Sequence, residues 1–94
     1  MRRKKTSYAV IGAGHGGKAM AAHLALAGHS VTVYNRTATK SIAFCAEYIS
    51  TGAPKHAETP RLAAQGADIV FCCVGNDADL RSVTLGADGA FAGM

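Results

Sequence analysis

The feature that most constrains this sequence is a glycine-rich turn directly after an apolar run near the N-terminus. Residues 8–11 read Tyr-Ala-Val-Ile, and glycines follow at positions 12, 14 and 17. At this spacing Gly12 makes a tight strand-to-helix turn, Gly14 lets a ligand approach the backbone, and Gly17 lets the helix lie close to the strand. The unpaired N–H groups of the first helical turn attract phosphate. The stretch therefore predicts a dinucleotide-binding loop.

Beyond the turn, apolar runs alternate with helical patterns, which is typical of an α/β chain. Met20, Leu24 and Ala27 fall on one face of the first predicted helix, and Ile42, Cys45 and Ile49 lie at helical spacing in the second. Right-handed crossovers then predict a Rossmann-type parallel sheet with helices on both faces and strand order 3-2-1-4. Strands are expected at 7–11, 29–34, 53–57 and 68–74, and helices at 16–27, 39–48, 60–65 and 78–85.

Composition limits the chain to one small globular domain. It has 94 residues, of which 49% are hydrophobic and 17% charged. The formal net charge of +4 equals the four basic residues at 2–5, since the other six Lys and Arg balance six Asp and Glu. We therefore expect residues 1–6 to be a solvated basic tail and residues 7–94 to be a partial dinucleotide-binding domain. A basic stripe or aromatic platform for nucleic acid is missing from the body.

The sequence also argues against a membrane, a disulfide and a metal site. The longest apolar runs fall well short of the roughly 20 residues that a membrane helix needs, and the basic start lacks the apolar segment of a signal peptide. We therefore expect a cytoplasmic protein. Cys72 and Cys73 would point to opposite faces of a strand, and the histidines lack partners at ligand spacing. The three cysteines, which include Cys45, are expected to be small buried hydrophobes.

The end of the second predicted strand bears on the choice of cofactor. Folds specific for NAD usually place Asp or Glu there to accept hydrogen bonds from the adenine ribose. This chain has Asn35, Arg36 and Thr37 at that point and no acidic residue between 29 and 47. Arg36 offers a planar fork for a phosphate, Thr37 a hydroxyl and Lys40 a further charge. The pattern predicts NADP(H); a surface arginine at the start of a helix is the alternative.

Several blocks occur in the order and spacing of one known family. They are Gly12-x-Gly14-x-x-Gly17-x-Ala19-Met20-Ala21, Gly28-His29-x-Val31-x-Val33-x-Asn35-Arg36-Thr37, Thr59-Pro60-x-x-Ala63-Ala64, Ala67-Asp68-Ile69-Val70, Cys73-Val74-x-x-Asp77 and Leu85-Gly86-x-Asp88-Gly89-x-x-Ala92-Gly93. Through them almost the whole chain after Thr6 resembles the β-hydroxyacid dehydrogenase family, which includes 3-hydroxyisobutyrate dehydrogenase and the glyoxylate and succinic semialdehyde reductases. The glycine loop, Gly-Ala-Gly-His-Gly-Gly, is also similar to that of opine dehydrogenases.

The resemblance implies hydride transfer between NADP(H) and a small β-hydroxyacid or semialdehyde in a complete enzyme. Enzymes of that family are about three times longer, with later strands and an all-helical domain that carries the catalytic lysine. Nothing here matches that lysine, because Lys18, Lys40 and Lys55 fall at unrelated positions. We therefore expect the cofactor half of an oxidoreductase, with no catalytic residue of its own. The alternatives are an opine-dehydrogenase-like cofactor domain and a non-catalytic Rossmann module.

The expected cofactor site combines three segments. By resemblance, the end of the fourth strand and the loop after it lie beside the nicotinamide ribose; Asp77 could instead, or also, cap the following helix, and His15 could simply face solvent. No metal is expected. The predicted cofactor-binding residues are Gly12, Ala13, Gly14, His15, Gly16, Gly17, Asn35, Arg36, Thr37, Lys40, Cys73, Val74, Gly75 and Asp77.

The fourth predicted strand raises the question of partners. Residues 69–74 are apolar enough for a central strand, yet no fifth strand follows to cover their edge. An exposed apolar edge tends to pair with another strand. We therefore expect the edge to be covered by a missing substrate domain or by a second copy of this chain.

Overall fold

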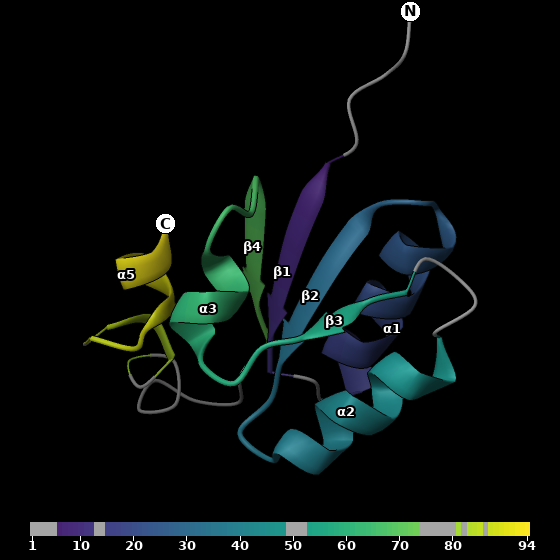
Figure 1. Ribbon diagram of the computed structural model, residues 1–94, viewed down its shortest axis with the longest axis horizontal. Coiled ribbons are helices and arrows are strands. Elements are labelled where there is room, and N and C mark those ends of the chain that lie inside the picture. Colours follow the sequence, from purple (N-terminus) through teal and green to yellow (C-terminus); the bar gives the residue numbers. More distant parts are fainter. Residues whose placement is uncertain (1–5, 13–14, 49–52, 74–80, 82, 86) are drawn as a thin grey trace, which may run out of the picture.

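The four strands of this protein form one parallel sheet, with helices on both sides (Figure 1). A computed structural model describes residues 6–12, 15–48, 53–73, 81, 83–85 and 87–94. The strand order is β3-β2-β1-β4, which confirms the predicted order 3-2-1-4. The elements are β1 (Ser7–Ile11), α1 (His15–Leu26), β2 (Ser30–Tyr34), α2 (Ala38–Glu47), β3 (Lys55–His56), α3 (Pro60–Ala64), β4 (Ile69–Cys72) and α5 (Ala90–Gly93).

Strand β1 is the centre of the sheet and is hydrogen-bonded on both sides. It pairs with β2 from Ser7 opposite Ser30 to Ile11 opposite Tyr34, and with β4 up to Ile11 opposite Cys72. Its last three residues are fully buried, as expected for a parallel strand covered on both faces. Because every pairing is parallel, the carboxyl ends of all four strands meet at one edge of the sheet.

Side chains along β1 point alternately to the two faces of the sheet and contribute to two separate apolar cores. Val10 faces α1 and α2, while Ala9 and Ile11 face α3 and α5, so each face of the sheet has its own apolar cluster. The first cluster consists of Ala9, Ile11, Ala57, Ala63, Ala64, Val83 and Ala90. The second consists of Val10, Ala21, Ala25, Val31, Val33 and Phe44.

Only some of the apolar residues at helical spacing in α1 and α2 contact the core: Leu24 and Cys45 pack half-buried against the second cluster. In α1 the smaller residues Ala21 and Ala25 are buried, while Ala27 lies beyond the helix and is exposed. Small side chains at these positions let the helix axis approach the sheet closely. Among the described residues of α2, Ser41 and Phe44 are buried, and Ile42 is 53% exposed. Ile49 lies outside the described residues.

Helix α3 begins as its sequence predicts. Thr59 is the N-cap in extended conformation, Pro60 is the first helical residue, and the Leu62 N–H donates to Thr59 Oγ1 at 3.1 Å. Gly66, with φ of +77°, follows the end of the helix in the left-handed region that glycine tolerates best. The Asp68 N–H then donates to the Ser7 carbonyl and leads the chain into β4.

The short helix α5 was not predicted. A Cβ on its Gly93 would lie 2.1 Å from the Arg61 carbonyl oxygen, and one on Gly89 would lie 2.4 Å from the Leu85 carbonyl oxygen. Glycine at both positions therefore lets the last turn pack directly against backbone, including that of α3. The Arg61 N–H completes the contact by donating to the Asp88 carbonyl at 2.8 Å.

Two smaller predictions have mixed outcomes. Of the predicted helix at 78–85, Arg81, Val83 and Thr84 are helical, and the remainder is largely outside the described residues. The prediction of three buried cysteines is wrong for Cys72, which is exposed because β4 is an edge strand, while Cys45 and Cys73 are half-buried. Among the described helices, none is long and apolar enough to cross a membrane.

Candidate functional site

The turn between β1 and α1 has the backbone geometry that its glycines predict. Gly12 has a φ of +89°, and its N–H donates to the Tyr34 carbonyl at 2.8 Å, which joins the turn to the end of β2. A Cβ on Gly17 would lie 2.3 Å from the Gly12 carbonyl oxygen and 3.2 Å from Cys73 Cβ. Gly12 and Gly17 thus have the turn-forming and close-packing roles expected of them. Ala13 and Gly14 lie outside the described residues.

Helix α1 directs its N-terminus toward the edge where the strands end. It begins at His15, immediately after the turn, and has no acidic residue in its first turn. Its 12 residues give it a positive end with unpaired N–H groups, which favours an anion there. His15 and Gly16 therefore contribute backbone to this position. Lys18 lies 3.7 Å from Glu47 in an exposed ion pair, which contributes little stability.

The segment after β2 presents cationic and polar groups at the same edge. Arg36, Thr37 and Lys40 are exposed, and Asn35 is half-buried, with its Nδ2 donating to the Thr37 carbonyl at 3.2 Å. Thr37 is the N-cap residue of α2 by position, yet its side chain makes no capping hydrogen bond. Its hydroxyl is therefore not committed to the helix terminus.

The end of β4 forms the third part of the site. The Cys73 N–H donates to the Ile11 carbonyl at 2.7 Å, which keeps this residue beside the start of α1. Cys72 and Cys73 face opposite sides of the sheet, as predicted. Cys73 packs against the second apolar cluster, and Cys72 is exposed. Val74, Gly75 and Asp77 lie outside the described residues, so the predictions made for them stay predictions.

Two cysteine thiols of the chain have raised pKa values. Burial raises the pKa of Cys72, with a smaller contribution from the neighbouring Cys73, and burial also raises the pKa of Cys45. A higher pKa leaves less thiolate at neutral pH, and the thiolate is the reactive form. Within the described ranges, no group of three His, Cys, Asp or Glu side chains could hold a metal ion.

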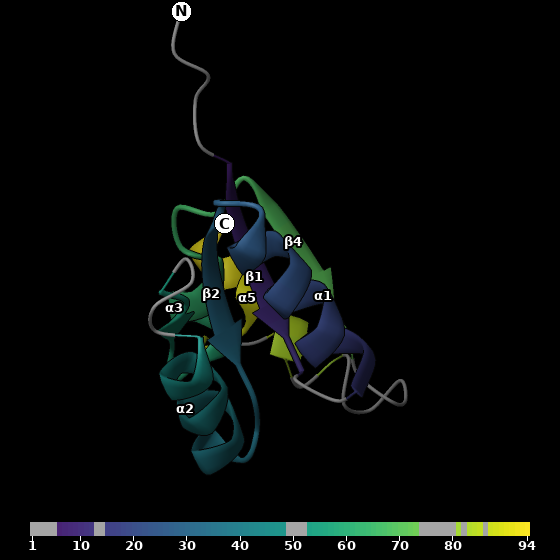
Figure 2. The ribbon, with the colours of Figure 1, turned by 90° about the vertical axis from the view of Figure 1, so that its right-hand side faces the viewer.

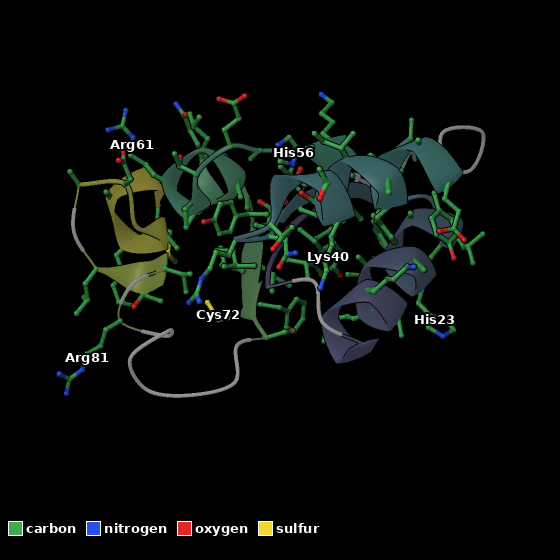
Figure 3. The ribbon with its side chains drawn as sticks, turned by 90° about the horizontal axis from the view of Figure 1, so that it is seen from below. His23, Lys40, His56, Arg61, Cys72 and Arg81 are labelled. Atoms are coloured by element: carbon green, nitrogen blue, oxygen red, sulfur yellow. The ribbon has the colours of Figure 1, made fainter. Side chains whose placement is uncertain are left out.

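The tertiary structure brings these segments together at one edge of the sheet. Figure 3 views the molecule from the side toward which the strands point, with Lys40 and Cys72 labelled on that side. Ligands of open parallel sheets bind outside the carboxyl ends of the strands, near a reversal of strand order. Here that reversal lies between β1 and β4, directly at the turn of Gly12. The arrangement fits a dinucleotide with its pyrophosphate on α1 and its adenosine toward α2.

Two structural contributors could not be recognised in the sequence. The Tyr34 carbonyl anchors Gly12, and backbone acceptors leave no trace in residue type. Ser41, fully buried in α2, lies 2.7 Å from His56 Nδ1 of β3 through its Oγ atom. These two residues are 15 positions apart, and only the packing of α2 on the sheet edge joins them.

Comparison with known proteins agrees with this geometry. Residues 7–94 match the family described as the NAD binding domain of 6-phosphogluconate dehydrogenase. An uncharacterized oxidoreductase of Shewanella frigidimarina is 54% identical over 86 residues, covering 92% of this chain and 28% of that protein. The probable 3-hydroxyisobutyrate dehydrogenase-like 3, mitochondrial, of Arabidopsis thaliana is 40% identical over 90 residues, covering 96% of this chain and 27% of that protein.

Two further similarities extend the comparison. The human cytokine-like nuclear factor N-PAC is 34% identical over 84 residues, which cover 89% of this chain and 14% of that protein. A solved structure of a diketoreductase aligns with 85% of this chain and 35% of its own at a TM-score of 0.63 and 22% identity, which supports the fold. This chain thus spans less than a third of the oxidoreductases it matches. It belongs to the family described as the NAD binding domain of 6-phosphogluconate dehydrogenase, and it is an NAD(P)-binding domain similar to proteins named as oxidoreductases and as 3-hydroxyisobutyrate dehydrogenase-like.

Proposed function

We propose that this domain binds NADP(H) in preference to NAD(H), for hydride transfer to or from a small β-hydroxyacid or semialdehyde in a complete enzyme. The observation that carries the cofactor preference is the exposed pair Arg36 and Lys40 directly after β2, in a stretch without a carboxylate. A guanidinium binds a phosphate through two parallel hydrogen bonds, and an acidic residue there would repel it. Both features favour the additional 2′-phosphate of NADP(H).

The test is a calorimetric titration of the purified chain with NADPH and NADH, beside an Arg36→Ala variant. Loss of a charge-assisted hydrogen bond should weaken NADPH binding by about tenfold or more and leave NADH binding nearly unchanged. Arg61→Ala is the matched control, since Arg61 is also exposed but belongs to α3, away from Lys40 (Figure 3). Equal binding of both cofactors by the unmodified chain would contradict the preference.

We infer that the chain holds and orients the cofactor and supplies no catalytic acid or base. The nicotinamide, when bound, carries the hydride, and the proton for the developing alkoxide must come from another group. In the described part of the chain, Lys18 is paired with Glu47 and Lys55 is exposed on β3, the edge strand farthest from β4. The chain with NADPH and a small semialdehyde should therefore bind cofactor without turnover. Sustained oxidation of NADPH would overturn this part of the proposal.

The titration with NADPH and NADH also tests a non-catalytic role, which is the alternative because one relative is named a nuclear factor rather than an oxidoreductase. A module of that kind would retain the fold while NADPH and NADH both fail to bind at millimolar concentration. Binding with the Arg36 dependence described above favours the oxidoreductase.

We also propose that the outer edge of β4 receives a further strand, from a substrate domain or from a second copy of this chain. Ile69 is 42% exposed and Cys72 is exposed, and among the described strands none pairs with the outer edge of β4. Helices α1 and α3 lie on opposite faces of the sheet (Figure 2). Phe71 is half-buried and stacks on Tyr8 with ring centroids 6.1 Å apart. An uncharged strand of this kind favours pairing.

A further inference from the structure

One partly buried hydrogen bond ties the N-terminal half of α2 to the edge strand β3. Ser41 Oγ and His56 Nδ1 lie 2.7 Å apart, with the donor set by the tautomer of the ring. Ser41 is fully buried and His56 is half-buried. Strand β3 is itself held by β2, since Val33 pairs with His56 and the Ala57 N–H donates to the Val33 carbonyl at 2.9 Å. The bond therefore joins α2 to a fixed part of the sheet.

Other contacts hold α2 mainly through its second half. Phe44 is buried in the second apolar cluster, and its ring packs on that of Tyr48 with ring centroids 4.9 Å apart. At the other end, Thr37 makes no side-chain cap. Ser41 thus joins the N-terminal half of α2 to β3, while Phe44 packs the helix into the second apolar cluster.

The anchored part of α2 carries the proposed phosphate-binding groups. Lys40 immediately precedes Ser41, and its N–H donates to the Thr37 carbonyl at 3.0 Å, which ties Lys40 to the start of the helix. Lys40 and His56 lie near the same end of α2 (Figure 3). A shift of α2 on the sheet would displace Lys40, and with it the segment of Arg36 that leads into the helix, relative to the glycine turn. Small displacements weaken bidentate phosphate contacts, whose geometry is strict.

We infer that Ser41 and His56 are positioning residues for the adenosine end of the site. Their hydrogen bond sets the orientation of α2, and through it where Arg36 and Lys40 meet the 2′-phosphate. The inference rests on the proposed NADP(H) preference and adds to it two residues that do not touch the cofactor.

The test compares the affinities of the full chain for 2′,5′-ADP and 5′-AMP, which differ in the 2′-phosphate. His56→Leu and Ser41→Ala remove the hydrogen bond, and each should lower the affinity ratio about two- to tenfold. His56→Asn should retain the ratio. The asparagine amide has a polar atom bonded to Cγ, at the position that Nδ1 takes in histidine. Affinity for 5′-AMP should change little in all three variants.

Thr59→Ala is the control for a general loss of stability. It removes another side-chain hydrogen bond, the cap to the Leu62 N–H, from α3 on the opposite face of the sheet. It should lower the melting temperature and leave the affinity ratio unchanged. The inference is overturned if His56→Leu keeps the ratio, or if Thr59→Ala lowers it as much. A wild-type chain that does not distinguish the two nucleotides would overturn the NADP(H) proposal and this inference together; a ratio that depends on Arg36 but not on His56 would overturn only the latter.

Discussion

Gly17 faces the carbonyl oxygen of Gly12 so closely that a Cβ on Gly17 would lie 2.3 Å from it. Real Cβ atoms do not approach a backbone oxygen to this distance, so α1 can lie where it does only with glycine at this position. The same contact holds the N-terminus of α1 against the end of β1. Packing and the proposed phosphate position therefore depend on one pair of residues.

Gly17→Ala should destabilise the domain by about 1–3 kcal/mol, because α1 must shift away from the turn. This sign is the reverse of that for an ordinary glycine inside a helix, where alanine stabilises by roughly 0.5–1 kcal/mol. Chemical denaturation measures the change, and NADPH titration of the folded variant should show weakened binding.

Gly28→Ala is the control for this prediction. Gly28 follows the other end of α1 with a φ of +89°, and a Cβ there would meet nothing within 4 Å. The variant should lose about 1–2 kcal/mol through backbone strain alone and bind NADPH normally when folded. A stable Gly17→Ala variant with unchanged binding would show that the close contact is dispensable.

Asn35→Asp combined with Arg36→Ala should change the cofactor preference from NADPH to NADH. Asn35 directly follows β2, at the position where an acid accepts hydrogen bonds from the ribose hydroxyls and repels a 2′-phosphate. We expect the ratio of NADPH to NADH affinity to fall by about a hundredfold, from two charge-related effects of roughly 1.5 kcal/mol each. Arg36→Ala alone separates loss of phosphate binding from gain of ribose binding. An unchanged preference in the double variant would place the adenosine elsewhere.

Pairing at the β4 edge should be weakened by a charge on the exposed Ile69. If a second copy covers this edge, light scattering after size-exclusion should show dimers at high concentration, and Ile69→Lys should reduce them. Ile42→Lys is the matched control, because Ile42 is similarly exposed, at 53%, but lies on α2. A chain that stays monomeric at every concentration would leave a substrate domain as the occupant of the edge.

Cys72 should react slowly with iodoacetamide at neutral pH despite its exposure. Burial and the nearby Cys73 raise the pKa of Cys72, so its thiolate fraction at a given pH is smaller than that of free cysteine. Labelling should therefore accelerate only as the pH rises through the raised pKa, above the range in which free cysteine already reacts. Peptide mapping after timed labelling at several pH values measures this. Cys73→Ser should speed the reaction, and equal rates for Cys72 and free cysteine would contradict the prediction.

The raised pKa of Cys72 also predicts a small dependence of the free energy of unfolding on pH. The native chain holds the Cys72 proton more tightly than the unfolded chain, so this contribution is fully present below the unfolded pKa and is lost as the pH rises through the folded pKa. Cys72→Ser should accordingly reduce the loss of stability on the alkaline side, as measured by denaturant unfolding.

Much of the architecture was predictable because it depends on local rules. The continuous apolar run of β1, the φ above zero of Gly12 and the cap of Thr59 each follow from residue type and immediate neighbours. The strand order follows from parallel connectivity once these elements are known. The choice of buried side in α1 and α2 was not predictable in this way, since apolar residues occur around much of each helix and the spacing to the sheet decides which are covered.

The sequence by itself thus determined the parallel α/β class, the glycine turn and the cationic segment of Arg36 and Lys40, because each rests on residue chemistry and short spacing. Only the tertiary structure decided that Ser41 meets His56, that Tyr34 anchors Gly12, and that glycines at 89 and 93 pack the last turn against backbone. These contacts join residues distant in the sequence or involve backbone atoms common to all residues. Their positions follow from how closely the layers pack, and a sequence pattern does not encode that distance directly.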